Sequence, residues 1–600
     1  MLEPQTRAAL TEQLRPPPGF ELAHAVGTTF TLDLASALAV PLSFASHRVA
    51  ARDDTLGVLD SIRRAADRVD IFAQAGEITM GTRSDLVAFL EPMVHPVAPR
   101  RGLFHPKVWF LEYRAGEASA FRFLCSSRNL TADRSWDVIV RLDGHPASPG
   151  KLRDAAAINR PLVDLLRSLA DRAVHPISPA RRARIDELAA RWRGIVWDLP
   201  DPMRAVAFHA FGVGEPPDLD LHGKRVLIIS PFLSDEGVGA LRTRIRTETH
   251  LVSRAESLDR LGSRSFDTRL SAYVLDDAAS PPSDESAQGA DVPVPRAEPL
   301  AGLHAKAVIL DRSDGAHVFL GSANATDAGW SANVEVMIEF VGPAPRVGVE
   351  ATLRALGDLA VPYETTGGKE PNAREEAERA LESLVRSLAS ARFSARLLTD
   401  VGYALRVWAD ETFTAAAARH EDVVITWHLL TRPDLGSATI GYDESTGVVI
   451  DDIPLADITP FLVLTATDSG GNQRRTVALA RLLDDVENRR DAVIARQLTD
   501  RAAFIRLLTL LLELSGVSVT DGNSADAAGF FGSTARGGTG AGLFEALVRA
   551  VGDDHGGLSD ARRIIDYLRE HDADAVLPDG FDELWSQVWA AHRLLRGEEE

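Results

Sequence analysis

The alternation of hydrophobic and polar positions along the chain predicts short buried strands interleaved with amphipathic helices. Apolar runs at 69–73 and 226–230 are bounded by polar residues, which is typical of strands buried on both faces. Apolar residues recur with helical spacing at 152–171, 179–193 and 238–246. Strands and helices that alternate in this way predict mixed α/β halves.

The pattern changes after residue 343. A linker is expected at 365–371 and a long amphipathic helix at 374–398. Short runs between 403 and 466, in which apolar and polar residues alternate, predict a small antiparallel β domain. The remaining expected helices are 475–515, 543–551, 560–570 and 582–596.

These patterns divide the chain into successive segments. The expected order is an N-terminal arm, a first α/β half, a helical connector, a second α/β half, a linker with a helix, a small β domain and a C-terminal helical region. Their bounds, in that order, are 1–20, 21–150, 151–200, 201–345, 346–395, 396–470 and 471–600. A stretch at 280–300 rich in Pro, Ser and acidic residues predicts a loop, either a passive insertion or a lid over a site.

The composition is that of an ordinary globular protein, with 45% apolar and 25% charged residues among 600. A single cysteine, Cys125, excludes an internal disulfide framework and suits a reducing cytoplasm. The N-terminal sequence lacks the basic start and apolar run of a signal peptide. No stretch reaches the roughly 18 apolar residues of a membrane span. We therefore expect a cytoplasmic protein without integral membrane association.

The net charge of −21 argues against a large nonspecific grip on nucleic acid. The charge is uneven, because residues 101–200 hold 17 Lys and Arg against 11 Asp and Glu. Arg101, Arg128 and Arg134 belong to this basic excess and are candidates for binding a polyanionic substrate. The alternative is that Arg is simply the usual surface cation of this chain, since Lys is scarce throughout.

Polar side chains that a buried strand normally excludes stand at the ends of two apolar runs between residues 303 and 324. His304 and Lys306 are two residues apart, so on a strand they point to one face. Ser322 and Asn324 leave the second run with the same spacing. Together these groups suit a phosphate site, in which the His attacks or donates a proton while Lys and Asn hold anionic oxygens.

The same pattern occurs earlier in the chain, where His105, Lys107, Ser127 and Asn129 occupy the same relative positions. His105 to Asn129 spans 24 residues and the equivalent stretch of the second copy spans 20, a difference that one loop can absorb. Two such copies about 200 residues apart indicate a duplicated unit.

The repeated pattern H-x-K-x4-D followed by G-S-x-N resembles the phospholipase D superfamily, the HKD phosphodiesterases. The second copy matches fully, with Asp311 at the acidic position and Glu335 behind it in Asn333-x-Glu335. The first copy has Glu112 for Asp and Ser126 for Gly. The resemblance covers about residues 20–345. It implies two phospholipase D-like mixed α/β halves related by pseudo-two-fold symmetry.

A pair of histidines in one site suits the cleavage of a phosphodiester in two steps, as the resemblance to the phospholipase D superfamily implies. One His attacks phosphorus and forms a phosphohistidine, and the other protonates the leaving oxygen and then activates water. The resemblance implies His105 as the nucleophile and His304 as the acid, although the residues alone do not decide between them. Neither a metal nor a cofactor is expected. The candidate orienting residues are Glu112, Asp137, Asp311 and Glu335.

Three functional hypotheses follow from these residues. The first is a metal-independent nuclease acting on DNA or RNA, because the motif neighbourhood also resembles HKD-type proteins of bacterial restriction and phage-defence loci. The second is a cytoplasmic phospholipase D-like lipid hydrolase. The third is a noncatalytic nucleic-acid-binding subunit of a defence complex. The acidic C-terminal region is a candidate for docking a protein partner, and the sequence indicates no oligomeric state.

Overall fold

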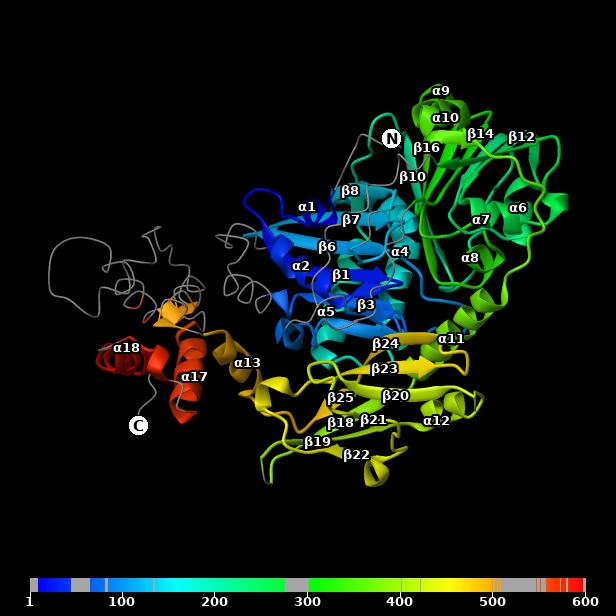
Figure 1. The fold of residues 1–600 in the computed structure, drawn as a ribbon. Coiled ribbons are helices and arrows are strands. Elements are labelled where there is room, and N and C mark those ends of the chain that lie inside the picture. Colours follow the sequence, from blue (N-terminus) through cyan, green and yellow to red (C-terminus); the bar gives the residue numbers. More distant parts are fainter. Residues whose placement is uncertain are drawn as a thin grey trace.

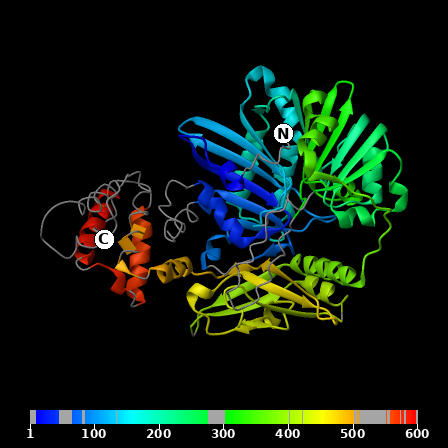
Figure 2. The ribbon, with the colours of Figure 1, turned by 45° about the horizontal axis from the view of Figure 1, so that its top comes forward.

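The computed structural model shows two α/β halves side by side, a strand-rich module below them and a group of helices at one side (Figure 1). The same arrangement is visible after rotation (Figure 2). The described residues are 9–44, 65–80, 85–132, 135–275, 302–400, 402–420, 422–498, 500–501, 504–505, 507–508, 547, 551, 557–571, 574–578 and 581–596.

A seven-stranded mixed sheet forms the first half. Its strands are β1 (Glu21–Thr29), β3 (Val69–Gln74), β5 (Val94–Val97), β6 (Val108–Ala115), β7 (Ala118–Ser126), β8 (Ile139–Pro146) and β9 (Ile195–Trp197). Their order is β5-β3-β1-β6-β7-β8-β9. The β5-β3-β1 part is parallel, and each pair from β1 to β9 is antiparallel.

An eight-stranded sheet forms the second half. Its strands are β10 (Ala205–Phe211), β11 (Gly223–Ile229), β12 (Ile245–Ser253), β13 (Leu270–Leu275), β14 (Ala307–Arg312), β15 (Gly315–Gly321), β16 (Glu335–Gly342) and β17 (Ala360–Pro362). Their order is β10-β16-β15-β14-β11-β12-β13-β17. The β11-β12-β13 part is parallel and the pairs from β11 through β14, β15 and β16 to β10 are antiparallel.

The two sheets repeat one plan, since β1, β3 and β5 correspond to β11, β12 and β13, and β6, β7 and β8 correspond to β14, β15 and β16. The edge strand next to β8 is β9, and the edge strand next to β16 is β10. The chain that connects the halves therefore contributes one edge strand to each sheet. The mixed α/β fold with two similar halves is thereby confirmed. The helices of this part are α2 (Leu34–Phe44), α4 (Leu152–Arg172), α5 (Pro179–Trp192), α6 (Asp235–Arg242), α7 (Ala255–Arg260), α8 (Asp327–Ser331), α9 (Ala344–Val347) and α10 (Val349–Leu356).

One hydrophobic core joins the two halves. Phe110 and Phe123 of the first sheet contact Trp192 of α5, with ring centroids 4.8 and 5.9 Å away. The same buried cluster continues through Leu320 and Ile338 of the second sheet. Each large apolar side chain buried in this way contributes roughly 1.5–3 kcal/mol. The core therefore fixes how the halves face each other.

The strand-rich module follows α11 (Ala373–Ala389) and holds two four-stranded sheets. Their orders are β22-β19-β18-β25 and β21-β20-β23-β24. Its elements are β18 (Phe393–Leu398), β19 (Ala404–Ala409), α12 (Glu411–Ala417), β20 (Val424–Leu429), β21 (Gly436–Ser437), β22 (Val448–Ile450), β23 (Phe461–Thr467), β24 (Gln473–Leu479) and β25 (Arg481–Leu483). All pairs except β18 with β25 are antiparallel, as the alternating pattern predicts.

Buried ion pairs hold the helices on either side of this module, α11 and α13 (Arg489–Gln497), against the first half. Arg489 Nη2 lies 2.6 Å from Glu91 Oε2, and Arg386 Nη1 lies 2.9 Å from Glu77 Oε1. Arg489 is 2% exposed and Glu77 4%. Buried charges are costly unless they are paired, so these contacts define one docked position.

The described part of the N-terminal segment is not the loose arm that the sequence predicts. Residues 9–20 lie against the first sheet, and Leu14 is fully buried. The Tyr113 hydroxyl donates to the Leu14 carbonyl at 2.8 Å, and Arg122 Nη1 donates to the Gln13 carbonyl at 2.7 Å. The segment, which includes α1 (Leu10–Gln13), therefore satisfies buried donors of the sheet.

Three predicted helices were too long, and the one predicted at 238–246 ends at Arg242, because Ile245 begins β12. The helix predicted at 374–398 ends at Ala389, because FSARLL alternates with period two and forms β18. The start of the helix predicted at 475–515 is strand, since TVAL pairs along β23 and extends the β part beyond residue 470. Helices follow as α13 (Arg489–Gln497), α17 (Gly557–Glu570) and α18 (Phe581–Arg596). The predicted loop at 280–300 and most of the predicted helix at 543–551 lie outside the described residues.

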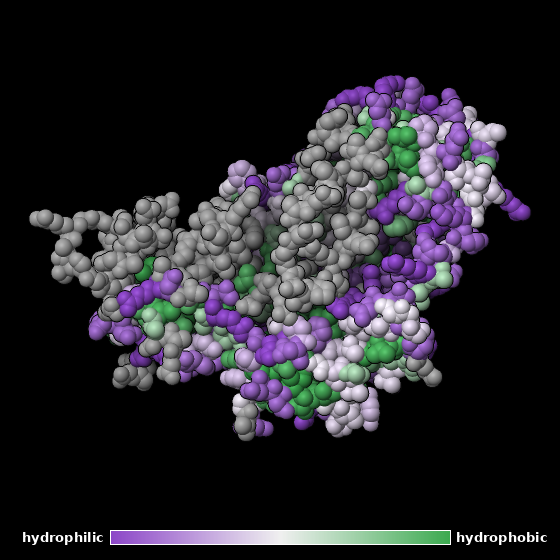
Figure 3. All heavy atoms as spheres, viewed as in Figure 1, coloured by the Kyte–Doolittle hydropathy of each residue, from purple (hydrophilic) through white to green (hydrophobic). Residues whose placement is uncertain are grey.

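Hydrophilic and hydrophobic residues are mixed over the visible surface (Figure 3). Hydrophilic residues dominate around the top of the second half, and hydrophobic patches are visible on the module below. Within the described ranges, none of the helices combines the length and apolarity needed to cross a membrane.

Candidate active site

The two sequence motifs lie at the same edge of their respective sheets. His105 and Lys107 lie just before the start of β6, and Ser127 lies just after the end of the neighbouring strand β7. His304 and Lys306 precede β14 in the same way. Antiparallel pairing of adjacent strands thus brings the ends of each motif together.

Each motif is anchored by the other half. Phe104 forms an isolated bridge with Val334, and Leu303 forms the equivalent bridge with Trp136. The backbone N–H of the following histidine donates across in both cases, from His105 to the Val334 carbonyl at 2.9 Å and from the second histidine to the Trp136 carbonyl at 2.8 Å. This crossed pairing places both motifs at one site between the halves.

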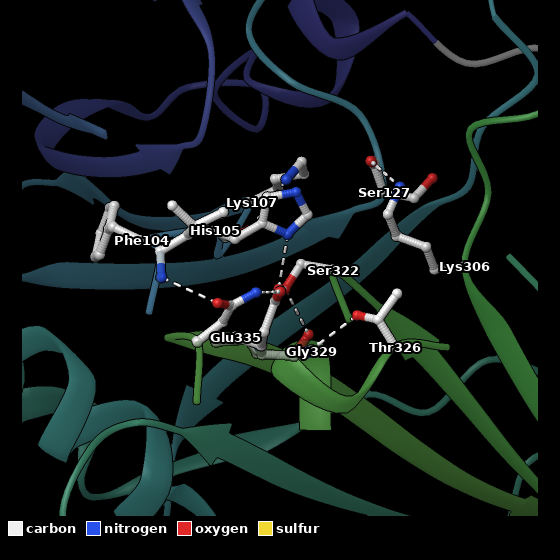
Figure 4. A network of polar contacts seen from close by, with 12 residues as sticks. Phe104, His105, Lys107, Ser127, Lys306, Ser322, Thr326, Gly329 and Glu335 are labelled. Carbon is white, nitrogen blue, oxygen red and sulfur yellow. Dashed lines mark hydrogen bonds and ion pairs between the residues drawn. The ribbon is translucent and has the colours of Figure 1, made fainter. Parts of the chain in front are cut away.

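A direct contact joins the two motifs. Lys306 Nζ of the second copy donates to the Ser127 carbonyl of the first copy at 3.4 Å, which Figure 4 shows beside His105. The two serines also have matching roles. Ser127 Oγ accepts the Val138 N–H at 2.9 Å, and Ser322 Oγ accepts the equivalent Val336 N–H at 3.0 Å.

The imidazole of His105 is oriented by a carboxylate from the second half. His105 Nδ1 lies 2.9 Å from Glu335 Oε2. Glu335 is fully buried and also accepts hydrogen bonds from Ser322 Oγ at 2.5 Å and from Asn333 Nδ2 at 3.3 Å. A carboxylate only accepts, so Nδ1 carries the ring proton and Nε2 presents a lone pair.

His105 is neutral at physiological pH. Burial lowers its pKa to about 4, the nearby Lys107 and Lys306 act in the same direction, and Glu335 only partly offsets them. A neutral imidazole with its lone pair on Nε2 is the form that can attack phosphorus.

The second histidine has a different partner. Lys306 Nζ lies 3.4 Å from His304 Nδ1. When Lys306 carries its proton, the ammonium group can only donate, so Nδ1 accepts this bond and the ring proton lies on Nε2. Burial, with Lys306 and Lys107 nearby, holds the pKa of His304 well below its usual value. The two imidazoles therefore present opposite groups, a lone pair from one and a proton from the other.

Asp137 occupies the position equivalent to Glu335 but is one methylene shorter. Its Oδ2 lies 3.8 Å from Arg128 Nε. Arg128 also donates from Nη2 to the Thr131 carbonyl at 2.9 Å. Asp137 remains a candidate orienting residue for the second imidazole.

Both motif lysines are buried and donate to backbone carbonyls. Lys107 Nζ donates to the His105 carbonyl at 3.0 Å, and Lys306 Nζ donates to the His304 carbonyl at 2.7 Å. Burial lowers the pKa of Lys107 to about 7 and holds that of Lys306 well below its usual value. A bound anion would offset the cost of burying the two lysine charges, so the pair of lysines is suited to binding a phosphate group.

The two motif asparagines carry buried amide oxygens without a hydrogen-bond partner, namely Asn129 Oδ1 and Asn324 Oδ1. Buried polar atoms are normally satisfied, and unsatisfied ones mark places where a missing group binds. An amide oxygen only accepts, so each of these atoms lacks a donor such as water, and the Nδ2 group of the same side chain is the one that can donate to an anion.

The acidic residues of the motifs have other partners. Glu112 accepts from Arg191 Nη2 at 2.6 Å and from Arg114 at 3.1 Å. Asp311 accepts from Arg225 Nη2 at 2.9 Å and from the Val349 N–H at 3.1 Å. Five residues of strand separate each acid from its motif lysine, about 15 Å. These bonds brace helices against the sheets.

The predicted substrate-binding arginines lie in different settings. Arg101 is exposed, and its neighbour Gly102 packs closely on Ala332 of the second half. Arg134 lies outside the described residues.

Sequence reasoning missed Arg254, whose Nε and Nη2 donate to the carbonyl of Leu303 at 3.0 and 2.9 Å. Arg254 directly follows the parallel strand β12. Ligands of open α/β sheets gather at the carboxyl ends of parallel strands, so this position was the available signal.

Cys125 is 1% exposed, and burial raises the pKa of its thiol to about 12, so it is not a nucleophile. Within the described ranges, no group of three or more His, Cys, Asp or Glu residues could hold a metal ion.

No protein-family model and no curated protein matches the sequence. Solved structures with a similar fold include the tyrosyl-DNA phosphodiesterase of yeast, with 11% identity, a TM-score of 0.34 and coverage of 56% of this chain and 87% of that one. A phosphatidylserine synthase of Haemophilus influenzae has 13% identity, a TM-score of 0.33 and coverage of 63% and 90%. A polyphosphate kinase of Porphyromonas gingivalis has 12% identity, a TM-score of 0.31 and 63% coverage of this chain, which spans only 50% of that kinase.

Proposed function

We propose that this protein is a metal-independent phosphodiesterase of the phospholipase D type, and that it is a nuclease. The observation that carries the proposal is the crossed pairing of the halves. In support of it, His105 pairs with Glu335 of the other half, and Lys306, which contacts His304, reaches the Ser127 carbonyl of the first motif.

In the first step His105 Nε2 attacks phosphorus, and a P–N bond forms as the P–O bond to the leaving group breaks. His304 Nε2 gives its proton to the leaving oxygen. Its Nδ1 takes a proton from the Lys306 ammonium group at 3.4 Å, so the ring remains neutral. Lys107 and the asparagine amides stabilise the charge that builds on the non-bridging oxygens.

The second step hydrolyses the phosphohistidine. Water attacks phosphorus opposite the P–N bond and gives a proton to His304 Nε2, while Nδ1 returns its proton to Lys306. The P–N bond breaks and restores the Nε2 lone pair of His105. The sum is one phosphodiester and one water converted to an alcohol and a phosphomonoester.

Nucleic acid is the substrate that the surroundings favour. The first motif lies in the basic stretch of residues 101–200, with Arg101 before it and Arg128 between its Ser127 and Asn129. Arg254 adds a cation beside the second motif, where its charge acts on both His304 and Lys306. Phosphate backbones attract such arginines. By its resemblance to HKD proteins of phage-defence loci, we assign the nuclease a role in bacterial defence, in the cytoplasm.

The test is turnover in excess EDTA of three labelled substrates: single-stranded DNA, RNA and phospholipid vesicles. The nuclease proposal expects cleavage of DNA or RNA. Headgroup release alone would instead establish a lipid hydrolase, and binding without turnover a noncatalytic subunit. His105→Ala and His304→Ala should each abolish turnover. His145→Ala, at an exposed histidine at the end of β8, is the matched control and should retain it.

A further inference from the structure

Two aromatic rings flank the motifs, one in each half. Phe30 directly follows β1, and its ring centroid lies 5.0 Å from that of His105 and 5.8 Å from Lys107 Nζ. Phe232 lies in the loop after β11 and is 45% exposed. The guanidinium carbon of Arg254 lies 5.2 Å from its ring centroid.

The loops that carry these rings are equivalent in the two halves. Thr29 Oγ1 donates to the carbonyl of Thr31 at 2.8 Å and accepts the N–H of Leu130 at 3.0 Å. In the second half Ser230 Oγ donates to the Phe232 carbonyl at 2.7 Å and accepts the Ala325 N–H at 2.9 Å.

Leu130 and Ala325 are the residues that follow the motif asparagines. A parallel bridge then joins Leu32 to Leu130 and Leu233 to Ala325. Each aromatic loop is therefore pinned to the motif of its own half, and the ring has a fixed position beside the phosphate site.

Arg254 is fixed as well. Its two donors share the carbonyl of Leu303, the residue before His304. Its guanidinium group over Phe232 combines a planar cation with an aromatic face. A single exposed Phe is ordinary on a protein surface. Phe232 differs from such a residue, because its loop is held in place by hydrogen bonds and its partner Arg254 is held by the motif itself. The two side chains therefore form a preorganised surface.

We propose that Phe232 and Arg254 form a nucleobase-binding subsite beside His304, and that Phe30, which stands at the position of Pro231 in the equivalent loop, offers a second aromatic face beside His105. This inference rests on the proposed function and narrows its substrate to single-stranded nucleic acid. A base must be unpaired to offer a face for stacking, and aromatic rings and guanidinium planes are the groups on which unpaired bases stack. Arg254 at the ring disfavours an acyl chain, which needs a wholly apolar surface.

The test compares two labelled single-stranded oligonucleotides that differ only at the scissile position, where one carries a base on each side of the phosphate and the other carries abasic residues. Phe232→Ala should lower kcat/KM on the first substrate about tenfold, as expected for the loss of one stacked base. Phe232→Trp should restore most of the rate. The wild-type to Phe232→Ala ratio should fall toward 1 on the abasic substrate. Tyr442→Ala, an aromatic that is 63% exposed on the β module, is the matched control.

The outcomes separate the subsite from the proposed function. If the wild-type chain cleaves both oligonucleotides equally well and Phe232→Ala changes neither rate, the subsite is overturned and the nuclease stands. If the chain cleaves vesicle phospholipid and neither oligonucleotide, the nuclease is overturned and the subsite with it. A Phe232→Ala loss that is as large on the abasic substrate would also overturn stacking, because no base is there to stack.

Discussion

His105 Nδ1 lies 2.9 Å from Glu335 Oε2, although 230 residues separate them in the sequence. The bond crosses from one half of the molecule to the other. It fixes the tautomer of the imidazole, and thus decides which nitrogen faces the substrate. The same carboxylate is held by Ser322 and Asn333, so its position is set before any substrate arrives.

Glu335→Gln should lower kcat on the cleaved oligonucleotide by about 100-fold with a smaller change in KM. The amide keeps the size of the side chain but has no negative charge. When its NH2 group faces Nδ1 of His105, it offers a donor there and favours the wrong tautomer. Steady-state kinetics in EDTA measures both constants. Glu339→Gln, at a carboxylate paired with His209 and His317 on the second sheet, is the control and should keep kcat within about twofold. A Glu335→Gln enzyme with wild-type kcat would show that the carboxylate does not orient the nucleophile.

The pH profile of kcat/KM should be shifted to low pH on both sides. The pKa of His105 is about 4, so its lone pair becomes available as the pH rises through about 4 and not through the ordinary histidine range. The pKa of Lys107 is about 7, so its charge is lost as the pH rises above about 7.

Lys107→Arg supplies the control for this profile, because a guanidinium group stays charged. The acid limb should stay near pH 4, and the alkaline limb that remains should report Lys306 alone, whose ammonium group the first step also requires and whose pKa burial holds well below its usual value. An acid limb centred near 6.5 in the wild-type enzyme, or rates that are constant up to pH 10, would contradict the assignment.

Much of the fold and of the site was predictable from local pattern. The buried strands at 69–73 and 226–230 and the helices α4 and α5 were found from periodicity, because burial on one face or on both leaves a direct mark on the sequence. The motif residues were found because they repeat. Arg254 and Phe232 were missed because they match no motif and reach the site only through the order of strands in the sheet, which local pattern does not contain.

The errors have the same origin. From the sequence alone Leu14 and its neighbours look like a loose arm, but Tyr113 of β6 and Arg122 of β7 donate hydrogen bonds to their carbonyls. The local sequence of β24 predicts a helix, but in the structure this segment pairs with β23 and forms a strand. Long-range pairing overrode local preference in both cases.

Asp311→Asn should lower the free energy of unfolding by about 2–3 kcal/mol, because it weakens a largely buried pair with Arg225 and the bond to the N–H of Val349. The kcat of the folded enzyme should stay within about twofold, since Asp311 lies about 15 Å along the strand from the motif. Denaturant titration with parallel kinetics measures both. Asp314→Asn, at an exposed carboxylate that pairs with His317, should cost less than about 1 kcal/mol. A large loss of kcat in fully folded Asp311→Asn protein would assign this acid to the chemistry instead.

Arg489→Met should destabilise the protein by about 3 kcal/mol, because it leaves Glu91 buried without its cation. Burial already raises the pKa of Glu91. Adding Glu91→Gln to the same chain should recover part of the loss, and a double-mutant cycle by thermal and denaturant unfolding gives the coupling. Strictly additive effects would mean that the pair does not hold the β module on the first half.

The central claim is that one phosphorus is attacked by His105 while His304 serves the leaving oxygen. The most direct measurement is peptide mass spectrometry of His304→Ala protein after incubation in EDTA with a nucleotide p-nitrophenyl phosphodiester, whose leaving group needs no proton from His304, followed by an alkaline quench. Without the acid–base partner the P–N bond should be hydrolysed slowly, so we predict a phosphate-linked nucleotide adduct on the peptide that contains His105, absent from His105→Ala protein. An adduct on a different residue, or cleavage only when a divalent metal is restored, would contradict the account.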